Sequence, residues 1–180
     1  MASIKGFQLK NVKQTKGIEG YGCTASMYLN GKKIGTYADY GDGGMEDVTF
    51  VSKEAEENMI KTIIEFAKTY SNEFIIALYK ERPEQFADVC RRFKEAYPYI
   101  PDEDITIQTM ASNSIVWIVN EFLKLYEVEK VYKRYVKKGY RAVCAHGIDI
   151  AAYPASWSDE KILEEANGHK VYMSLDDFNV

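Results

Sequence analysis

Two carboxylates in the stretch YADYGDGG, residues 37–44, are the first candidates for chemistry in this 180-residue sequence. Asp39 and Asp42 stand just before a glycine pair, and Glu46 and Asp47 follow, so the stretch offers enough oxygen ligands for a cation. It lacks the D-x-[DN]-x-[DN]-G-x5-E frame of an EF-hand, and the same residue types fill ordinary turns. Three interpretations stay open: a turn, a loop that contacts a partner, and a cation or catalytic site.

A basic segment with the sequence EKVYKRYVKKGYR lies at residues 129–141. In a helix, its cations from Lys130 to Lys138 fall on one face, while its valines and two of its tyrosines fall largely on another. Such a face either keeps the surface solvated or binds phosphates or an acidic protein surface, where cations displace counterions and tyrosines stack. The cations that we expect to contact a partner are Lys133, Arg134, Lys137, Lys138 and Arg141.

Residues typical of metal, nucleophilic or phosphate sites do not form a recognised motif in the sequence. Cys144 and His146 are a close Cys/His pair, but a structural zinc site needs a second pair, and a Cys/His nucleophile needs a third group that orients the imidazole. The glycines at 17, 20 and 22 precede a predicted strand rather than a helix, and no GK[ST] follows them. We therefore expect no cofactor, no bound metal and no enzymatic activity.

The composition is that of a globular protein, with 46% hydrophobic and 28% charged residues and a net charge of −4. The three cysteines are widely spaced, so we expect reduced thiols inside a cell rather than a disulfide framework. No run of residues is long and apolar enough to span a bilayer, and the first residues lack the apolar region of a secretory signal. The sequence thus predicts a cytoplasmic protein without membrane contact.

Acidic residues are in excess at 52–104 and 142–180, on either side of the basic segment. They can simply be solvated caps and turns. Alternatively, they present anionic groups to a basic groove on a partner, and their presence argues against a chain that coats nucleic acid as a whole.

Strand patterns dominate the first 51 residues. Residues 4–13 alternate loosely and residues 21–29 alternate with one apolar face, which predicts two strands. Asn30-Gly31 is a pair that a type I′ hairpin turn selects, because both central residues need a positive φ. We therefore expect residues 21–29 and 32–39 to form a hairpin, followed by a short strand at 48–51.

Helical patterns follow. An apolar stripe predicts a helix over residues 53–70, with Ser52 as its N-cap and acidic residues in its first turn. The next segment, NEFIIALYKERP, is ambiguous between a buried strand and a helical turn, and Pro83 fits the first position of a further helix. Residues 112–138 contain neither Gly nor Pro, which predicts one long helix, or two joined near residue 127, ended by Gly139.

The last 40 residues mix both patterns, with strands expected at 140–145 and 170–175 and a short helix after Ser158. The predicted fold class is therefore α+β: an N-terminal antiparallel hairpin or sheet packed by amphipathic helices, then a C-terminal strand-helix-strand segment. We expect a single domain over residues 1–180. If it is subdivided, the boundaries fall after residues 51 and 138.

Residues 16–44, KGIEGYGCTASMYLNGKKIGTYADYGDGG, combine a Lys-Gly-x-Glu-Gly-x-Gly lead, an alternating strand, a GKKIG hairpin and a D-x-G-x-GG loop. This segment resembles small proteins carried by phages and integrative elements of Gram-positive bacteria, some of which are anti-CRISPR inhibitors of the type II RNA-guided DNA nuclease. The ending YMSLDDF is similar as well. The resemblance implies binding without turnover in a bacterial host cell, with Tyr40 and Asp42 at the exposed tip of a loop.

Three functional hypotheses follow. The first, which we prefer, is an inhibitor that binds a host nuclease or its guide-RNA complex and blocks DNA cleavage. The second is a nucleic-acid-binding accessory protein of a mobile element, with the basic segment against phosphates. The third is a metal-dependent enzyme with Asp39, Asp42 and Glu46 on the metal, and the missing ligand motif leaves it with the least support.

Overall fold

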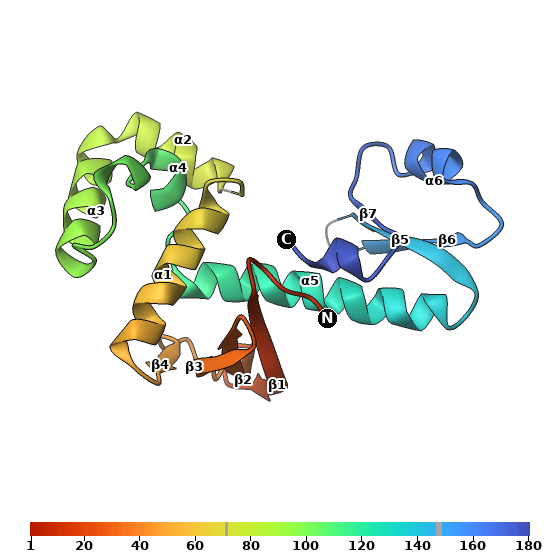
Figure 1. Ribbon diagram of the computed structural model, residues 1–180, viewed down its shortest axis with the longest axis horizontal. Helices are drawn as coiled ribbons and strands as arrows, with labels where there is room; N and C mark the ends of the chain where they lie inside the picture. Colours follow the sequence, from red (N-terminus) through yellow and green to blue (C-terminus); the bar gives the residue numbers. More distant parts are fainter. Residues whose placement is uncertain (71, 147–148) are drawn as a thin grey trace. The chain divides into compact units, whose positions relative to one another are not determined.

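The computed structural model describes residues 1–70, 72–146 and 149–180, without the side chains of residues 146 and 149, and it confirms the α+β fold class (Figure 1). The chain divides into two compact units. We call Lys5–Val119 the N-terminal unit, and Met1–Ile4 together with Asn120–Val180 the C-terminal unit. The single domain over residues 1–180 stays a prediction.

A four-stranded antiparallel sheet with the order β1-β2-β3-β4 begins the N-terminal unit. The predicted hairpin is confirmed, because β2 and β3 pair from Thr24 opposite Ala38 to Leu29 opposite Lys32. Its turn is as expected from the sequence, with φ of 49° at Asn30 and 79° at Gly31. The strands are β1 (Phe7–Lys16), β2 (Tyr21–Leu29), β3 (Lys32–Ala38) and β4 (Asp47–Phe50).

Helix α1 (Lys53–Ala67) contacts β3 and β4, and its buried face supplies much of the core of this unit. Ser52 is its N-cap, as predicted, and its side-chain oxygen accepts a hydrogen bond from the backbone N–H of Ala55 at 3.1 Å. The apolar spacing of the helix thus places one stripe against the apolar face of the sheet. The stripe includes Met59, Ile60, Ile63 and Ile64, and the sheet contributes Met27, Leu29, Ile34 and Tyr37.

The ambiguous segment after α1 is a helix, α2 (Glu73–Glu81), followed by α3 (Pro83–Ala96) and the single turn α4 (Ile107–Met110). Asn72 is the N-cap of α2, and its side-chain oxygen accepts a hydrogen bond from the N–H of Ile75 at 3.2 Å. Pro83 stands at the start of α3, as expected. No residue of α2 is fully buried.

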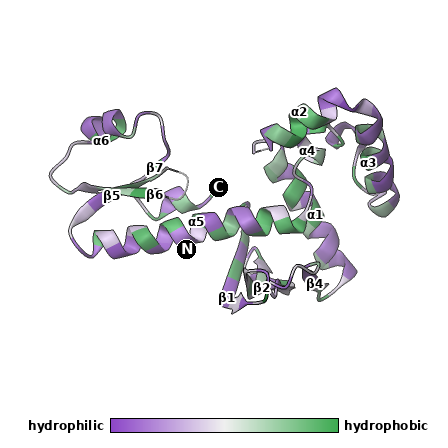
Figure 2. Cartoon of the chain, turned by 180° about the vertical axis from the view of Figure 1, so that it is seen from behind, coloured by the Kyte–Doolittle hydropathy of each residue, from purple (hydrophilic) through white to green (hydrophobic). Residues whose placement is uncertain are grey.

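A single helix, α5 (Ile115–Val136), fills the long stretch without Gly or Pro, so one of the two predicted alternatives is confirmed. Figure 2 shows hydrophobic and hydrophilic bands alternating along it. Gly139 follows with φ of 84°, and its N–H donates to the carbonyl of Val136 at 3.0 Å. This is the left-handed residue that the sequence predicts after the helix.

The C-terminal unit contains a three-stranded antiparallel sheet, in the order β6-β5-β7, and helix α6 (Asp159–Glu165), which Ser158 caps as predicted. Its strands are β5 (Tyr140–His146), β6 (Asp149–Pro154) and β7 (Val171–Tyr172). Strand β6 was not predicted. The expected strand over 170–175 is shorter, because a carboxylate oxygen of Asp177 accepts the N–H groups of Met173 and Ser174 at 2.6 and 2.7 Å.

Candidate functional site

Two loops at one end of the N-terminal sheet hold each other in place. The loop from β1 to β2 and the loop from β3 to β4 lie at the same end, because the four strands are antiparallel and in sequence order. The backbone N–H of Glu19 donates to the carbonyl of Gly41 at 2.9 Å, and the hydroxyl of Thr15 donates to the carbonyl of Asp39 at 2.6 Å. We call residues 17–22 and 39–47 together the double loop.

Both carboxylates of the YADYGDGG stretch build turns. Oδ1 of Asp39 accepts a hydrogen bond from the N–H of Gly41 at 2.8 Å, and Oδ1 of Asp42 accepts one from the N–H of Gly44 at 3.1 Å. Each is a side chain that bonds the backbone two residues later, so the stretch is a tandem repeat of Asp-x-Gly. Gly41 and Gly43 have φ of 67° and 75°, which suits glycine at these positions.

Glycine also permits the close approach of the two backbones. A Cβ atom on Gly41 would lie 2.5 Å from the carbonyl oxygen of Gly20. A Cβ on Gly17 would meet the carbonyl of Gly41, and one on Gly22 would meet that of Asp39. The glycines of the Lys-Gly-x-Glu-Gly-x-Gly lead and of the D-x-G-x-GG loop are therefore parts of one packed arrangement.

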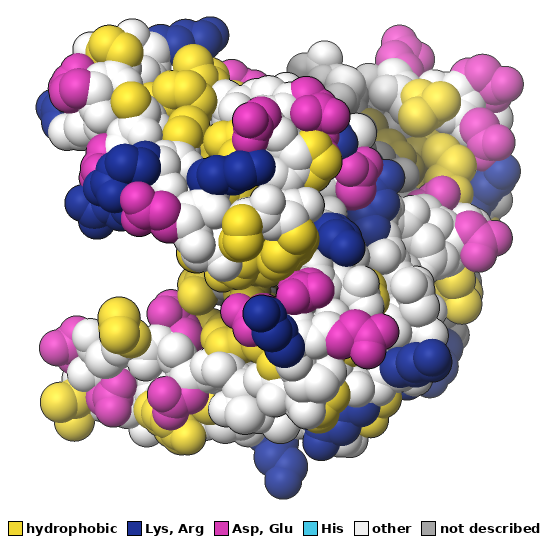
Figure 3. Space-filling view, turned by 60° about the vertical axis from the view of Figure 1, so that its left-hand side comes forward, with side chains coloured by type: hydrophobic (Ala, Val, Ile, Leu, Met, Phe, Trp, Pro, Cys, Tyr) yellow, Lys and Arg dark blue, Asp and Glu magenta, His cyan; other side chains and the backbone are white. Residues whose placement is uncertain are grey.

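The surface of the double loop is hydrophobic and acidic. It carries five acidic residues and neither Lys nor Arg. At the lower left of Figure 3, on the side of the sheet, hydrophobic and acidic side chains lie next to one another. Tyr40 and Asp42 are exposed, as expected. The exposed fractions of its large hydrophobic side chains are 92% for Ile18, 66% for Tyr21, 50% for Tyr40 and 93% for Met45.

Sequence reasoning missed Ile18, Tyr21 and Met45 as surface residues of this site. Ile18 stands between Gly17 and Glu19, and Met45 between Gly44 and Glu46. A hydrophobic residue isolated between a glycine and an acid has no periodic neighbour with which to share a buried face. That isolation is the signal by which the sequence indicates the exposure of Ile18 and Met45, whereas Tyr21 begins the alternating strand pattern and carries no such signal.

Two of the predicted cations of the basic segment are engaged with carboxylates. Lys133 Nζ lies 2.7 Å from Oε1 of Glu129, and Arg141 forms an ion pair with Asp159. The expected helical face is also shorter than predicted, because α5 ends at Val136 and Lys137 is in a turn. The prediction of one continuous helical face of cations is therefore wrong beyond this point.

Arg134, Lys137 and Lys138 remain exposed at the end of α5, and two of them lie over the ring of a tyrosine. The guanidinium carbon of Arg134 and Nζ of Lys138 each lie 5.7 Å from the ring centroid of Tyr135. The rings of Tyr135 and Tyr140 meet edge to face, with centroids 5.1 Å apart. The structure thus reduces the predicted basic face to a smaller group of cations around an aromatic pair.

Glu129 is the buried charge of this segment, with 1% of its side chain exposed. Besides Lys133, its carboxylate accepts the backbone N–H of Ala2 at 3.0 Å and lies 3.2 Å from the amino group of Met1. Burial alone would raise the pKa of Glu129, but the Lys133 ammonium and these N–H donors outweigh it and lower the pKa. Lys133 therefore has a structural partner within its own unit.

Residues that favour metal or nucleophilic chemistry are not assembled in the described part of the chain. Among the described residues, no group of three or more His, Cys, Asp or Glu is placed to hold a metal ion. Asp39, Asp42 and Glu46 therefore do not form such a group. Cys144 is fully buried, and burial raises the pKa of its thiol, against a smaller effect of the Tyr153 hydroxyl. The side chain of His146 lies outside the described residues.

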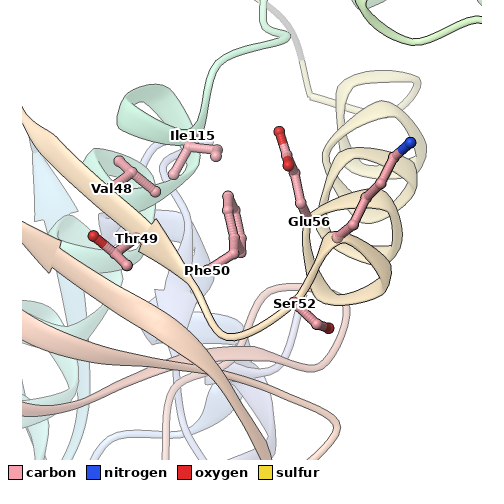
Figure 4. A pocket seen from close by; sticks show the side chains of 7 residues that line it. Val48, Thr49, Phe50, Ser52, Glu56 and Ile115 are labelled. Atoms are coloured by element: carbon pink, nitrogen blue, oxygen red, sulfur yellow. The ribbon is translucent and has the colours of Figure 1, made fainter.

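A surface hollow of about 710 Å³ lies beside β4 and the start of α1. In Figure 4, Val48 and Ile115 lie on one side of Phe50 and Glu56 on the other. The side-chain oxygen of Ser52, which also lines the hollow, is occupied as the cap of α1. The hollow has a mixed lining of apolar, polar and charged side chains, and the double loop, where exposed hydrophobic side chains cluster, is the stronger candidate site.

Comparisons with known proteins give no match from which this geometry could be interpreted. No family model matches the chain, and neither a curated protein nor a solved structure matches it. None of the helices in the described residues is both long and apolar enough to cross a membrane.

Proposed function

We propose that this chain is a binding protein without catalytic turnover, which docks through its double loop onto a basic surface of a partner protein. The observation that carries the proposal is the exposure of four large hydrophobic side chains among five acidic residues, on two loops fixed by their backbones. Isolated exposed hydrophobic residues are common, but a cluster on one rigid tip is typical of an interaction site.

In a protein–protein interface, affinity and selectivity usually come from different kinds of residue. Hydrophobic and aromatic anchors contribute most of the affinity, and surrounding charges steer the encounter and select the partner. The hydrogen bonds and glycine contacts between the loops order the backbone before binding, so less conformational entropy is lost on association. The acidic residues then favour a positively charged partner.

The partner that we propose is a host type II RNA-guided nuclease, or its guide-RNA complex, in the cytoplasm of a bacterial cell. Support comes from the resemblance of residues 16–44 to small proteins of phages and mobile elements. A nuclease holds its nucleic acids in a positively charged channel, which an acidic and hydrophobic tip complements. Binding there would block DNA cleavage at stoichiometric ratios.

The test is a titration of the full chain against the guide-loaded nuclease, with target DNA cleavage as the readout. Wild type should abolish cleavage near a one-to-one ratio, and the double variant Tyr40→Ala/Asp42→Asn should weaken inhibition at least tenfold. The matched control is Leu163→Ala/Glu164→Gln on α6, which removes an exposed hydrophobic group and a charge elsewhere. It should inhibit like wild type.

Unchanged cleavage at a large excess of wild type would refute the proposal for the nuclease tested. Equal inhibition by the two double variants would refute the role of the double loop. Thermal unfolding of each variant accompanies the titration, because both substitutions are at exposed side chains and should leave the melting temperature unchanged.

A second candidate function is nucleic-acid binding at the end of α5, and the placement of Arg134 and Lys138 over the ring of Tyr135, with the exposed Lys137 next to Lys138 in sequence, favours it. Cations beside aromatic rings bind phosphates and stack bases. Binding should weaken steeply as salt rises, and Lys137→Gln/Lys138→Gln should reduce the slope of log affinity against log salt. A slope that this variant leaves unchanged would exclude these lysines from the contact.

A further inference from the structure

The two faces of the N-terminal sheet have different compositions. Along β2, alternate residues from Cys23 to Leu29 are buried, while Thr24, Ser26 and Tyr28 point to the opposite side and keep partial exposure. The alternation is expected for an antiparallel sheet with one packed and one solvated face. We call the solvated side the outer face.

Strand pairing assembles the outer face from side chains that are distant in sequence. Tyr28 lies opposite Gln8 on one neighbouring strand and opposite Lys33 on the other. Since a direct partner across a strand pair shares the same face, the outer face can be read from the register. Its members are Gln8, Lys10, Lys13, Thr24, Ser26, Tyr28, Lys33, Thr36 and Thr49.

Lysines surround the aromatic ring on this face. Lys10 Nζ lies 4.3 Å from the ring centroid of Tyr28, and Lys33 is the direct cross-strand neighbour of Tyr28. In the described part of the chain, no carboxylate forms an ion pair with Lys10, Lys13 or Lys33. These cations therefore differ from Lys133 and Arg141, which are engaged with carboxylates.

Hydroxyl groups make up much of the rest of the face. Lys10 is paired with Ser26, Ser26 with Thr36, and Thr36 with Thr49, which forms a row across all four strands. Within the four described strands, Asp47 is the one carboxylate that the pairing places on this side, at the edge beside Ala38. The face thus offers cations, hydroxyl donors and one aromatic ring together.

We propose that the outer face of the N-terminal sheet binds single-stranded nucleic acid. Lysines would displace counterions from phosphates, serine and threonine hydroxyls would donate to phosphate oxygens, and Tyr28 would stack on a base. A single strand fits better than a duplex, because reading a duplex requires an element that enters a groove, whereas unstacked bases lie on aromatic side chains of a sheet. This site is separate from the double loop and does not rest on the proposed nuclease partner.

The experiment measures fluorescence anisotropy of a labelled oligothymidine of about 15 nucleotides with the full chain, across a series of salt concentrations. A duplex of the same length is measured in parallel. The variants are Lys10→Gln/Lys33→Gln and Tyr28→Thr, in which the β-branched replacement suits a strand. Lys53→Gln/Lys80→Gln is the matched control, since it removes two exposed lysines at the start of α1 and in the last turn of α2, outside both proposed nucleic-acid surfaces.

Wild type should bind the oligothymidine more tightly than the duplex. Removing Lys10 and Lys33 should reduce the slope of log affinity against log salt by about 1.4, or about 0.7 per phosphate contact. Tyr28→Thr should weaken binding by about five- to a hundredfold with a smaller change in slope. The control variant should keep both the affinity and the slope of wild type.

Three results would overturn the inference: no oligothymidine binding by wild type at low salt, tighter binding of the duplex, or a loss in the Lys53→Gln/Lys80→Gln control as large as that in Lys10→Gln/Lys33→Gln. Far-ultraviolet circular dichroism and thermal unfolding identify a variant that has lost its fold, and Tyr28→Ile, which also lacks a ring and suits a strand, then replaces Tyr28→Thr. Because no nuclease is present, failure here is distinguishable from failure of the cleavage titration.

Discussion

The double loop and the basic segment both stand out in the sequence as charged, tyrosine-containing surfaces, but the fold uses their charges differently. In the double loop, Asp39 and Asp42 bond to their own backbone, and the loops contact each other through main chain. In the function that we propose, the exposed side chains there contact the partner. In the basic segment, Lys133 and Arg141 engage carboxylates of their own unit.

This difference shows that a charged residue in the sequence is not always available to bind a partner, because the fold can engage it with another group of the same chain. A cation beside a carboxylate must give up that contact before it binds a phosphate, and a lysine held by a buried carboxylate gives it up least readily. By this criterion Lys133 is a structural residue, whereas Arg134 and Lys138 keep access to solvent around Tyr135. Four substitutions or conditions should separate the two regions, and their expected effects decrease from Glu129 to Arg141.

Substitution of Glu129 by Gln should have the largest effect, because it leaves Lys133 and the Ala2 N–H without their charged partner. We expect a loss of about 3 kcal/mol in the free energy of unfolding, measured by urea denaturation. The control is Glu127→Gln, which breaks the exposed pair with Lys130 and should cost less than about 1 kcal/mol. Equal losses in the two variants would remove the distinction between a structural and a solvated part of the basic segment.

Acidic pH should remove the contribution of the Glu129 carboxylate to the free energy of unfolding. Its pKa is lowered in the folded protein, so its stabilising effect is fully present above the unfolded pKa of about 4.5 and is lost as pH falls through the folded pKa. The difference in unfolding free energy between wild type and Glu129→Gln should therefore shrink below about pH 4.5. Urea denaturation at a series of pH values measures it, and a difference that grows toward acid would show the opposite shift.

Gly41→Ala should destabilise the double loop more than Gly31→Ala destabilises the hairpin turn. Both glycines have positive φ, 67° and 79°, so each substitution carries a backbone cost of roughly 1–2 kcal/mol. Only at Gly41 would the new Cβ also meet backbone, since nothing lies within 4 Å of that position at Gly31. Thermal unfolding measures the excess, and identical shifts in melting temperature would argue against tight contact between the two loops.

Arg141→Gln should have the smallest effect of the four. The side chains of Arg141 and Asp159 are both about half exposed, and such pairs contribute less than about 1 kcal/mol to stability. The melting temperature should change by no more than a few degrees. A loss as large as that of Glu129→Gln would show that this pair, too, is a structural element of the C-terminal unit.

Much of the fold could be predicted because its signals act over a few residues. Asn30-Gly31 favours its turn through the φ values that those two residues adopt, and Ser52 and Ser158 cap their helices through N–H groups three residues away. Pro83 and Gly139 mark helix ends for equally local reasons. Each of these interactions is complete within one turn of chain.

The candidate site depends on contacts between segments far apart in the chain, and the sequence alone does not predict which segments meet. Nothing local indicates that Gly41 packs on Gly20, that Lys33 flanks the same ring as Lys10, or that Asp159 engages Arg141. Strand β6 was missed for a related reason, since its strand state depends on pairing with β5 more than on its own pattern.

The sequence by itself therefore determined the turns, the caps and the α+β order of elements, since these depend on backbone preferences and near neighbours. The tertiary structure alone decided which charges stay available and which side chains share a surface. The physical reason is that ion pairing, burial and cross-strand register depend on distances between segments far apart in the chain, and only the folded packing sets those distances.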